Sequence, residues 1–182
     1  MLDTYLDYLN EGYLFSDKTI SINLDRFERG QSNKLLIVGL LGSGKTTLGE
    51  YLLKQYKVKE FVSDVGMDRM LKSLKNPNTR TIIEGAQIAW MYKDKPEHRE
   101  LILSCPMILI GMSAIKAGLR ADRRDGTTPM NAKNKKDIYY FIRKNISEWQ
   151  KYITYFRKDA LKIPNAKIEE YKIPKFKPVI GI

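Results

Sequence analysis

The hydrophobic pattern of the chain alternates between two periods from residue 34 onward. Short apolar runs of strand length are followed by segments in which apolar residues recur every three or four positions, as on a helix face. The runs predict strands at 34–39, 60–64, 79–85, 106–113 and 166–173. Helices are expected at 45–56, 66–75, 114–124 and 137–159, with a further helical piece within 86–103. Apolar strands that alternate with helices are typical of a parallel sheet covered on both faces, so the pattern predicts an α/β fold.

The helix expected at 137–159 is long and amphipathic. Its residues Ile138, Ile142, Ile146, Trp149 and Ile153 fall on one face. Aromatic residues among basic ones in this segment can contact a nucleic-acid strand, but core packing is the favoured interpretation for most of them.

The first 33 residues follow a separate pattern. Leu2, Tyr5, Leu6 and Leu9 have helical spacing, Ile20, Ile22 and Leu24 alternate as in a strand, and residues 28–33 are typical of a turn. We therefore treat residues 1–33 as an N-terminal extension that packs on the core or docks on a partner. Residues 34–182 form the main predicted domain.

A glycine-rich motif follows the strand expected at 34–39. Residues 39–46 read GLLGSGKT, which fits the spacing G-x-x-x-x-G-K-[ST] of a phosphate-binding loop. Glycines at 42 and 44 let backbone N–H groups turn toward phosphates, and the following helix N-terminus adds partial positive charge. Lys45 is expected to reach the β- and γ-phosphates, and the Thr46 hydroxyl to ligate Mg²⁺. The predicted ligands of ATP are Gly39, Gly42, Ser43, Gly44, Lys45, Thr46 and Thr47.

The segment FVSDVGMDRML after the second predicted strand is a further candidate for chemistry. Asp64 falls at the end of this strand, where it can accept or orient the proton of an acceptor hydroxyl. It can also be the N-cap of the next helix. Arg69 in that helix is a candidate for holding an acceptor phosphate.

The segment TIIEGAQ places a carboxylate at the end of an apolar strand. At that edge of the sheet Glu84 can hold Mg²⁺ through water or take the acceptor proton, or it can be a surface carboxylate. Gly85 would let a ligand approach the backbone. Gln87, Trp90 and Tyr92 either line an acceptor pocket or pack in the core, and core packing is favoured.

A basic stripe marks the helix expected at 114–124. Lys116, Arg120, Arg123 and Arg124 share one face of it. Phosphoryl transfer needs cations near the developing charge. Arg120 and Arg124 above all are therefore expected to clamp phosphates, with residues 116–136 as a lid. The alternative is a solvated basic face.

The order of these features resembles that of the small P-loop kinases. This group includes nucleoside monophosphate kinases, shikimate and gluconate kinases, zeta toxins and the kinase domain of polynucleotide kinases. The resemblance covers about residues 34–172 and implies a three-layer fold around a five-stranded parallel sheet of order 2-3-1-4-5. It also implies that Lys45 and Thr46 serve ATP·Mg²⁺, that Asp64 is the acceptor-side aspartate, and that Arg120 and Arg124 are lid arginines.

The sequence departs from two branches of this group. Its EGAQ segment matches neither the Asp-Gly-Phe-Pro-Arg of adenylate kinases nor the triple glycine of shikimate kinases, and there is no separate Walker B aspartate. The first 33 residues resemble the start of kinase-like proteins encoded by large phages.

Charge is distributed unevenly along the chain. The net charge is +11, yet residues 1–112 carry 15 Lys and Arg against 14 Asp and Glu, whereas residues 113–182 carry 17 against 7. This surplus indicates either a polyanionic partner, such as nucleotide phosphates or nucleic acid, or a basic face that keeps the protein soluble.

Composition narrows the setting further. A single cysteine and a single histidine exclude an internal disulfide and a Cys/His zinc site, and they suit a reducing, cytoplasmic compartment. Cys105 is interpreted as a small core residue. No apolar run approaches the length of a membrane span, so no membrane partner is expected.

Together these features predict an ATP- and Mg²⁺-dependent kinase with a nucleotide or nucleic-acid acceptor. The favoured form is a DNA-hydroxyl kinase that acts on a 5′ end or on a hydroxymethylated base. The alternatives are a nucleoside, nucleoside monophosphate or small-metabolite kinase, and a nucleotide-dependent binding module with little turnover. The oligomeric state is left open.

Overall fold

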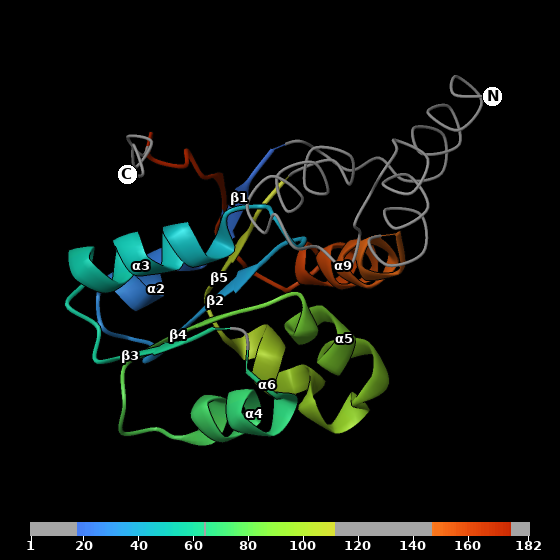
Figure 1. The fold of residues 1–182 in the computed structure, drawn as a ribbon, viewed down its shortest axis with the longest axis horizontal. Coiled ribbons are helices and arrows are strands. Elements are labelled where there is room, and N and C mark those ends of the chain that lie inside the picture. Colours follow the sequence, from blue (N-terminus) through green and yellow to red (C-terminus); the bar gives the residue numbers. More distant parts are fainter. Residues whose placement is uncertain (1–17, 64, 112–146, 176–182) are drawn as a thin grey trace, which may run out of the picture.

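The computed structural model describes residues 18–63, 65–111 and 147–175. The strands in these ranges are β1 (Ile20–Ile22), β2 (Lys34–Val38), β3 (Glu60–Val62), β4 (Thr81–Glu84), β5 (Met107–Leu109) and β6 (Ile168–Glu170). The helices are α2 (Leu24–Glu28), α3 (Lys45–Gln55), α4 (Met67–Lys75), α5 (Gln87–Asp94), α6 (Arg99–Ser104) and α9 (Ser147–Ala160), with a 3-10 turn at Pro96–His98. The fold is α/β, as the hydrophobic pattern predicts (Figure 1).

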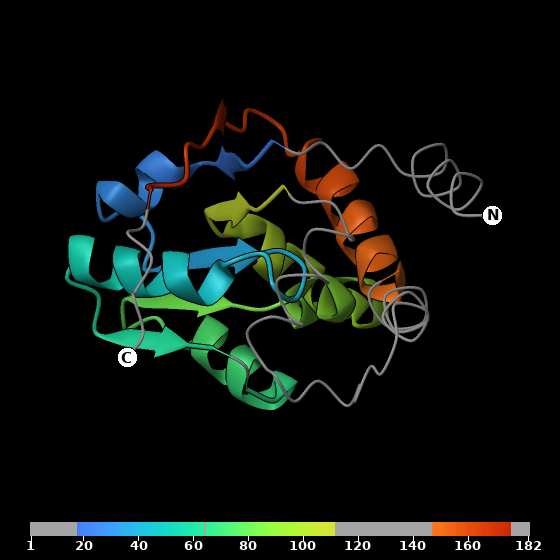
Figure 2. The same ribbon diagram turned by 45° about the horizontal axis from the view of Figure 1, so that its top comes forward.

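The strands form one mixed sheet in the order β3-β4-β2-β5-β1-β6 (Figure 2). β3, β4, β2 and β5 are parallel neighbours, whereas β1 is antiparallel to both β5 and β6. The expected five-stranded, purely parallel sheet of order 2-3-1-4-5 is therefore wrong. The edge of β5 is occupied by β1, whose Ile22 lies opposite Met107 on one side and Ile168 on the other. A strand from before the glycine loop thus separates the last two strands of the expected order.

The first strand is shorter than its alternating pattern predicts. Asn23 adopts a left-handed backbone conformation with φ 54°, and its side-chain oxygen accepts a hydrogen bond from the backbone N–H of Lys167 at 2.9 Å. Asn tolerates this conformation better than most residues. The chain then turns into α2, in which Leu24 and Phe27 are buried. The prediction failed because Leu24 fits the spacing of a strand with Ile22 and the spacing of a helix with Phe27.

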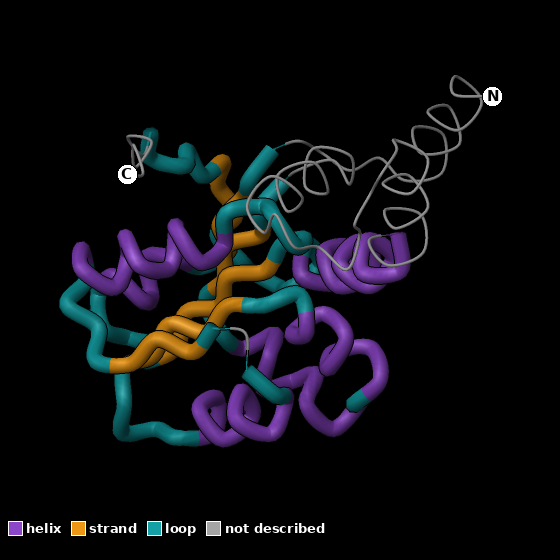
Figure 3. The backbone as a smooth tube through the Cα atoms, viewed as in Figure 1, coloured by secondary structure: helices purple, strands orange, loops and turns teal. Residues whose placement is uncertain are grey.

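The sheet separates two hydrophobic cores. Every residue of β2 is buried, and successive side chains point to opposite faces. Leu35 and Ile37 pack with residues of α2 and α3, whereas Leu36 and Val38 pack with residues of α4, α5, α6 and α9. Figure 3 shows the strands as the middle layer between these two groups of helices.

The described part of the long predicted helix, α9, packs against α5. Ile153 and Phe156 are buried, and the ring of Phe156 lies 5.1 Å from that of Tyr92 between centroids. The Tyr92 hydroxyl donates a hydrogen bond to the Asp159 carboxylate at 2.7 Å. Trp90 is partly buried against the same core. Core packing is thus confirmed for Tyr92 and for this face of α9.

Cys105 is also a core residue, as the sequence predicts. Its thiol is buried beside α6 and donates to the Leu101 carbonyl at 3.3 Å. Burial raises the pKa of this thiol to about 11, so it stays protonated and unreactive near neutral pH.

Candidate functional site

The glycine loop joins β2 to α3 at the carboxyl end of the strand. Gly42 and Gly44 have positive φ angles of 78° and 89°, a conformation that costs glycine little. Gly44 is the N-cap of α3, and its carbonyl accepts the first helical hydrogen bond, from the N–H of Leu48 at 3.0 Å. The strand–loop–helix arrangement that a phosphate-binding loop requires is therefore present.

Gly39 lets the loop fold back on itself. A Cβ at this position would lie 2.6 Å from the Ser43 hydroxyl oxygen and 3.1 Å from Cβ of Ile110. Ser43 is buried, and its hydroxyl makes no hydrogen bond with the residues that the structure describes. The loop thus encloses a hydroxyl group that has no described protein partner.

Lys45 and Thr46 begin α3 and both reach the end of β4. Lys45 is buried, and its ammonium donates to the Leu40 carbonyl at 2.9 Å while lying 4.0 Å from Oε2 of Glu84. The half-buried Thr46 donates its hydroxyl hydrogen to Oε1 of Glu84 at 2.9 Å. The two residues that the motif assigns to phosphate and metal therefore meet one carboxylate.

Glu84 ends β4, the parallel neighbour of β2, and is paired in register with Ile37. It is fully buried, with an exposed fraction of 0%, so the alternative of a surface carboxylate is wrong. Its Oε1 accepts hydrogen bonds from Thr46 and from the Ser63 hydroxyl, which follows β3. Its Oε2 has no hydrogen-bond partner in the described parts of the chain. A buried carboxylate oxygen without a donor is costly unless a cation or another ligand group compensates it.

The donor set fits a magnesium ion that is bound together with a nucleotide. Mg²⁺ in such sites takes one or two protein oxygens and completes its shell with phosphate oxygens and water. Thr46 and Glu84 supply those oxygens here, next to positive-φ glycines and a helix N-terminus. No group of three or more His, Cys, Asp or Glu side chains suited to a metal occurs in the described residues.

Only some of the residues that were expected to bind the phosphoryl acceptor lie near Glu84 in the structure. Gln87 is the first residue of α5. A Cβ placed on Gly85 would collide with the side-chain oxygen of Gln87 and would lie 2.7 Å from the terminal methyl of Met70. The Gln87 side chain thus lies against the backbone next to Glu84. Arg69 is exposed in α4, and it makes no side-chain hydrogen bond or ion pair with the described residues. Thr47 is exposed on α3 and is not brought into the contacts around Glu84.

Several predicted residues fall on parts of the chain that the structure does not describe. These are Asp64, the basic stripe of Lys116, Arg120, Arg123 and Arg124, and the predicted lid at 116–136.

Sequence reasoning missed Ser63 and the Leu40 carbonyl. Ser63 is the last described residue before Asp64, and its hydroxyl contacts Glu84 from the neighbouring strand. A signal was present, since a hydroxyl residue stands at a strand end that faces the glycine loop. The Leu40 contact had no signal, because a backbone carbonyl is available at every position of the loop.

Comparisons with protein-family models, with curated proteins and with solved structures found no match. Within the described ranges, no helix has both the length and the apolar character needed to cross a membrane.

Proposed function

We propose that the protein is a nucleotide-dependent phosphotransferase that moves the γ-phosphoryl group of ATP to a hydroxyl acceptor. The observation that carries this proposal is the buried group of Lys45, Thr46 and Glu84 at the mouth of the glycine loop. Such a combination of cation, hydroxyl and carboxylate suits a bound triphosphate with its metal. The carboxylate oxygen Oε2 and the Ser43 hydroxyl, both without a described hydrogen-bond partner, would be satisfied by such a ligand.

Each residue of the loop has a role in this proposal. Backbone N–H groups around Gly42 and Gly44 hold phosphate oxygens, because the left-handed glycines and the start of α3 orient them inward. Lys45 leaves the Leu40 carbonyl and neutralises charge between the β- and γ-phosphates. Thr46 and Glu84 would hold Mg²⁺, which would neutralise charge on the phosphate oxygens.

The transfer forms one bond and breaks one. The acceptor oxygen forms a bond to the γ-phosphorus. The bond between the γ-phosphorus and the β–γ bridging oxygen breaks, and ADP leaves with the electron pair of that bond. The acceptor proton passes to a carboxylate. We assign this base to Asp64, since Glu84 is fully buried and already accepts two hydrogen bonds on Oε1.

The basic surplus of residues 113–182 supports a nucleotide or nucleic-acid acceptor. We favour a DNA hydroxyl, at a 5′ end or on a hydroxymethylated base. Binding to DNA should then weaken steeply with salt, because each phosphate contact releases counterions. A weak dependence on salt would argue for an uncharged acceptor.

The test uses ATP labelled on the γ-phosphate, Mg²⁺ and an acceptor panel. The panel contains nucleosides, nucleoside monophosphates, 5′-hydroxyl DNA and RNA, hydroxymethylated DNA and small hydroxy acids. Label should appear on one acceptor, and Lys45→Ala should reduce the rate by about 10²–10³-fold, as for other preorganised charge contacts. ATP binding without transfer to any acceptor would contradict the proposal and favour a nucleotide-dependent binding module.

A further inference from the structure

Ser63 connects a third strand to the buried carboxylate. The residue directly follows β3 and is half-buried, and its hydroxyl donates to Oε1 of Glu84 from β4. Thr46, at the start of α3, donates to the same oxygen at 2.9 Å. Two donors from different elements therefore converge on one oxygen of a side chain that has no access to solvent.

This arrangement fixes the orientation of the carboxylate. With Oε1 held by two hydroxyls, rotation of the buried Glu84 carboxylate out of its plane would break both hydrogen bonds. The other oxygen, Oε2, therefore stays directed to the side of Lys45, whose ammonium is 4.0 Å away. Oε2 is also the atom that lacks a described hydrogen-bond partner.

We propose that Ser63 is a positioning residue that holds Glu84 with Oε2 turned toward the metal that accompanies the nucleotide. This inference rests on the proposed function, since it assigns a cation to Oε2. Ser63 acts through Glu84 and does not itself touch the nucleotide. Partners that orient a metal ligand in this way typically account for about 10- to 100-fold in metal affinity.

The experiment measures binding of a fluorescent ATP analogue to the full chain across a Mg²⁺ series and in EDTA, so that no acceptor or turnover is needed. Ser63→Ala should raise the Mg²⁺ concentration for half-maximal nucleotide binding by about tenfold. Affinity in EDTA should stay within about twofold, because the phosphate contacts of the glycine loop are unchanged. Ser63→Thr retains the hydroxyl and should restore the wild-type Mg²⁺ dependence.

The matched control is Ser73→Ala. Ser73 also donates its hydroxyl to a carboxylate, Oε1 of Glu60 at 3.4 Å, but from α4 and at the opposite end of the sheet. Its Mg²⁺ dependence should equal that of the wild type. Ser63→Cys provides a second variant of nearly unchanged shape, and its weak thiol donor should give a smaller rise in the same direction.

The outcomes separate the two proposals. Failure of the wild-type protein to bind the nucleotide at any Mg²⁺ concentration would overturn the proposed function and this inference with it. Nucleotide binding by the wild type with an unchanged Mg²⁺ dependence in Ser63→Ala and Ser63→Cys would overturn the positioning role alone. Equal loss of binding with and without Mg²⁺ would also overturn it, because it would show a structural effect on the loop.

Discussion

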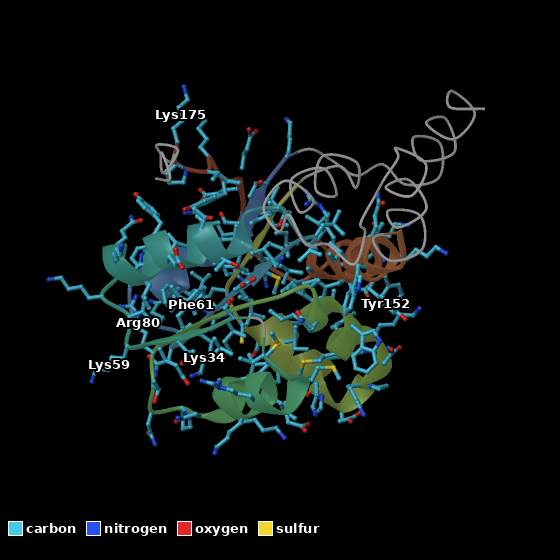
Figure 4. All side chains as sticks on the ribbon, viewed as in Figure 1. Lys34, Lys59, Phe61, Arg80, Tyr152 and Lys175 are labelled. Carbon is cyan, nitrogen blue, oxygen red and sulfur yellow. The ribbon has the colours of Figure 1, made fainter. Side chains whose placement is uncertain are left out.

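Two polar clusters of the same composition lie at opposite ends of three neighbouring strands, and Glu84 is fully buried in one whereas Glu60 is partly exposed in the other. At the carboxyl ends of β2, β3 and β4, Lys45, Thr46 and Ser63 surround Glu84. At the amino ends of the same strands, Ser73 and Thr81 donate hydrogen bonds to Glu60, and the Lys34 ammonium donates to Thr81. Figure 4 labels Lys34 and Arg80 at this second end.

The clusters differ in how their polar atoms are satisfied. The Lys34 ammonium donates to the Thr79 carbonyl at 2.6 Å and to the Thr81 hydroxyl at 3.0 Å. Both oxygens of Glu60 accept hydrogen bonds, from Ser73 and from Thr81. Around Glu84, both donated hydroxyls go to Oε1, and Oε2 has no described hydrogen-bond partner.

This contrast is the reason that we propose a binding role for the Glu84 cluster and not for the Glu60 cluster. Residue composition is the same in both places, so it does not identify the functional end. In the amino-end cluster, the protein's own groups form hydrogen bonds with the Lys34 ammonium and with both oxygens of Glu60, as is usual for polar groups inside proteins. In the carboxyl-end cluster, Oε2 of Glu84 accepts no hydrogen bond from the described residues. This oxygen lies beside a glycine loop and a helix N-terminus, and the three features together suit an anion with its cation.

The largest expected effect comes from replacing the carboxylate of each cluster, in turn, with an amide. Glu84→Gln should lower the affinity for Mg²⁺-nucleotide by up to about 100-fold, because it removes a metal ligand's charge. Affinity in EDTA should be equal or higher, since a negative charge near the phosphates is gone. Glu60→Gln should leave both affinities unchanged. Titration of a fluorescent nucleotide measures these values, and equal effects of the two variants on Mg²⁺ dependence would remove the distinction between the clusters.

Lys34→Met should act on stability and not on nucleotide binding. It removes two hydrogen bonds of a buried ammonium, each worth about 2 kcal/mol, and with them the cost of burying the charge, so the net contribution is about 2 kcal/mol. Urea unfolding should show a loss of about that size in the free energy of unfolding. Nucleotide affinity of the folded variant should match the wild type, and a Mg²⁺-dependent loss would contradict the structural assignment.

Gly39→Ala should disturb the loop through Ser43. The added methyl would lie 2.6 Å from the Ser43 hydroxyl oxygen, so the loop must shift. An overpacking cost of about 1.4 kcal/mol corresponds to about tenfold weaker nucleotide binding. Gly66→Ala is the matched control, because φ there is −59° and no atom lies within 4 Å of the added methyl. Equal affinities of the two variants would show that the loop tolerates the shift.

The smallest expected effect is a pH dependence of the amino-end cluster. Burial lowers the pKa of Lys34 from its usual 10.5. Between the lowered pKa and 10.5 the unfolded chain binds more protons, so the Lys34 contribution to stability rises with pH in that window.

The stability difference between the wild type and Lys34→Met should therefore grow with pH between the lowered pKa and 10.5. Urea unfolding of both proteins at each pH measures it. Tyr92, whose pKa burial raises to about 12, loses stabilisation above pH 10 in both proteins and cancels in the difference. A stability difference between the two proteins that decreases as pH rises would contradict the lowered pKa of Lys34.

Sequence alone predicted much of the parallel core but misplaced the N-terminal strand. The apolar runs at 34–39 and 79–85 contain β2 and β4, because burial on both faces demands continuous apolar residues. The insertion of β1 between β5 and β6 was missed. Strand pairing depends on which edge is open in the folded sheet. The local sequence around Ile20 and Ile22 does not specify which strands they pair with.

At the candidate site, too, the sequence predicted the local backbone but not the contacts between distant residues. The glycine spacing from Gly39 to Thr46 determines a local backbone, and the structure has the left-handed glycines and the helix start that this spacing predicts. Whether Glu84 is exposed, and which hydroxyl reaches it, depends on Ser63 and Thr46, which lie 21 and 38 residues away in the sequence.

The sequence by itself determined the α/β alternation and the backbone of the glycine loop that leads into α3, because these follow from short-range periodicity and spacing. The tertiary structure decided that the sheet is mixed, that Glu84 is fully buried and that the Ser63 hydroxyl donates a hydrogen bond to one of its oxygens. It also decided which of two Lys–Thr–Ser–Glu clusters retains an acceptor without a described donor. The physical reason is that hydrogen-bond satisfaction inside a protein is a property of groups brought together from distant strands.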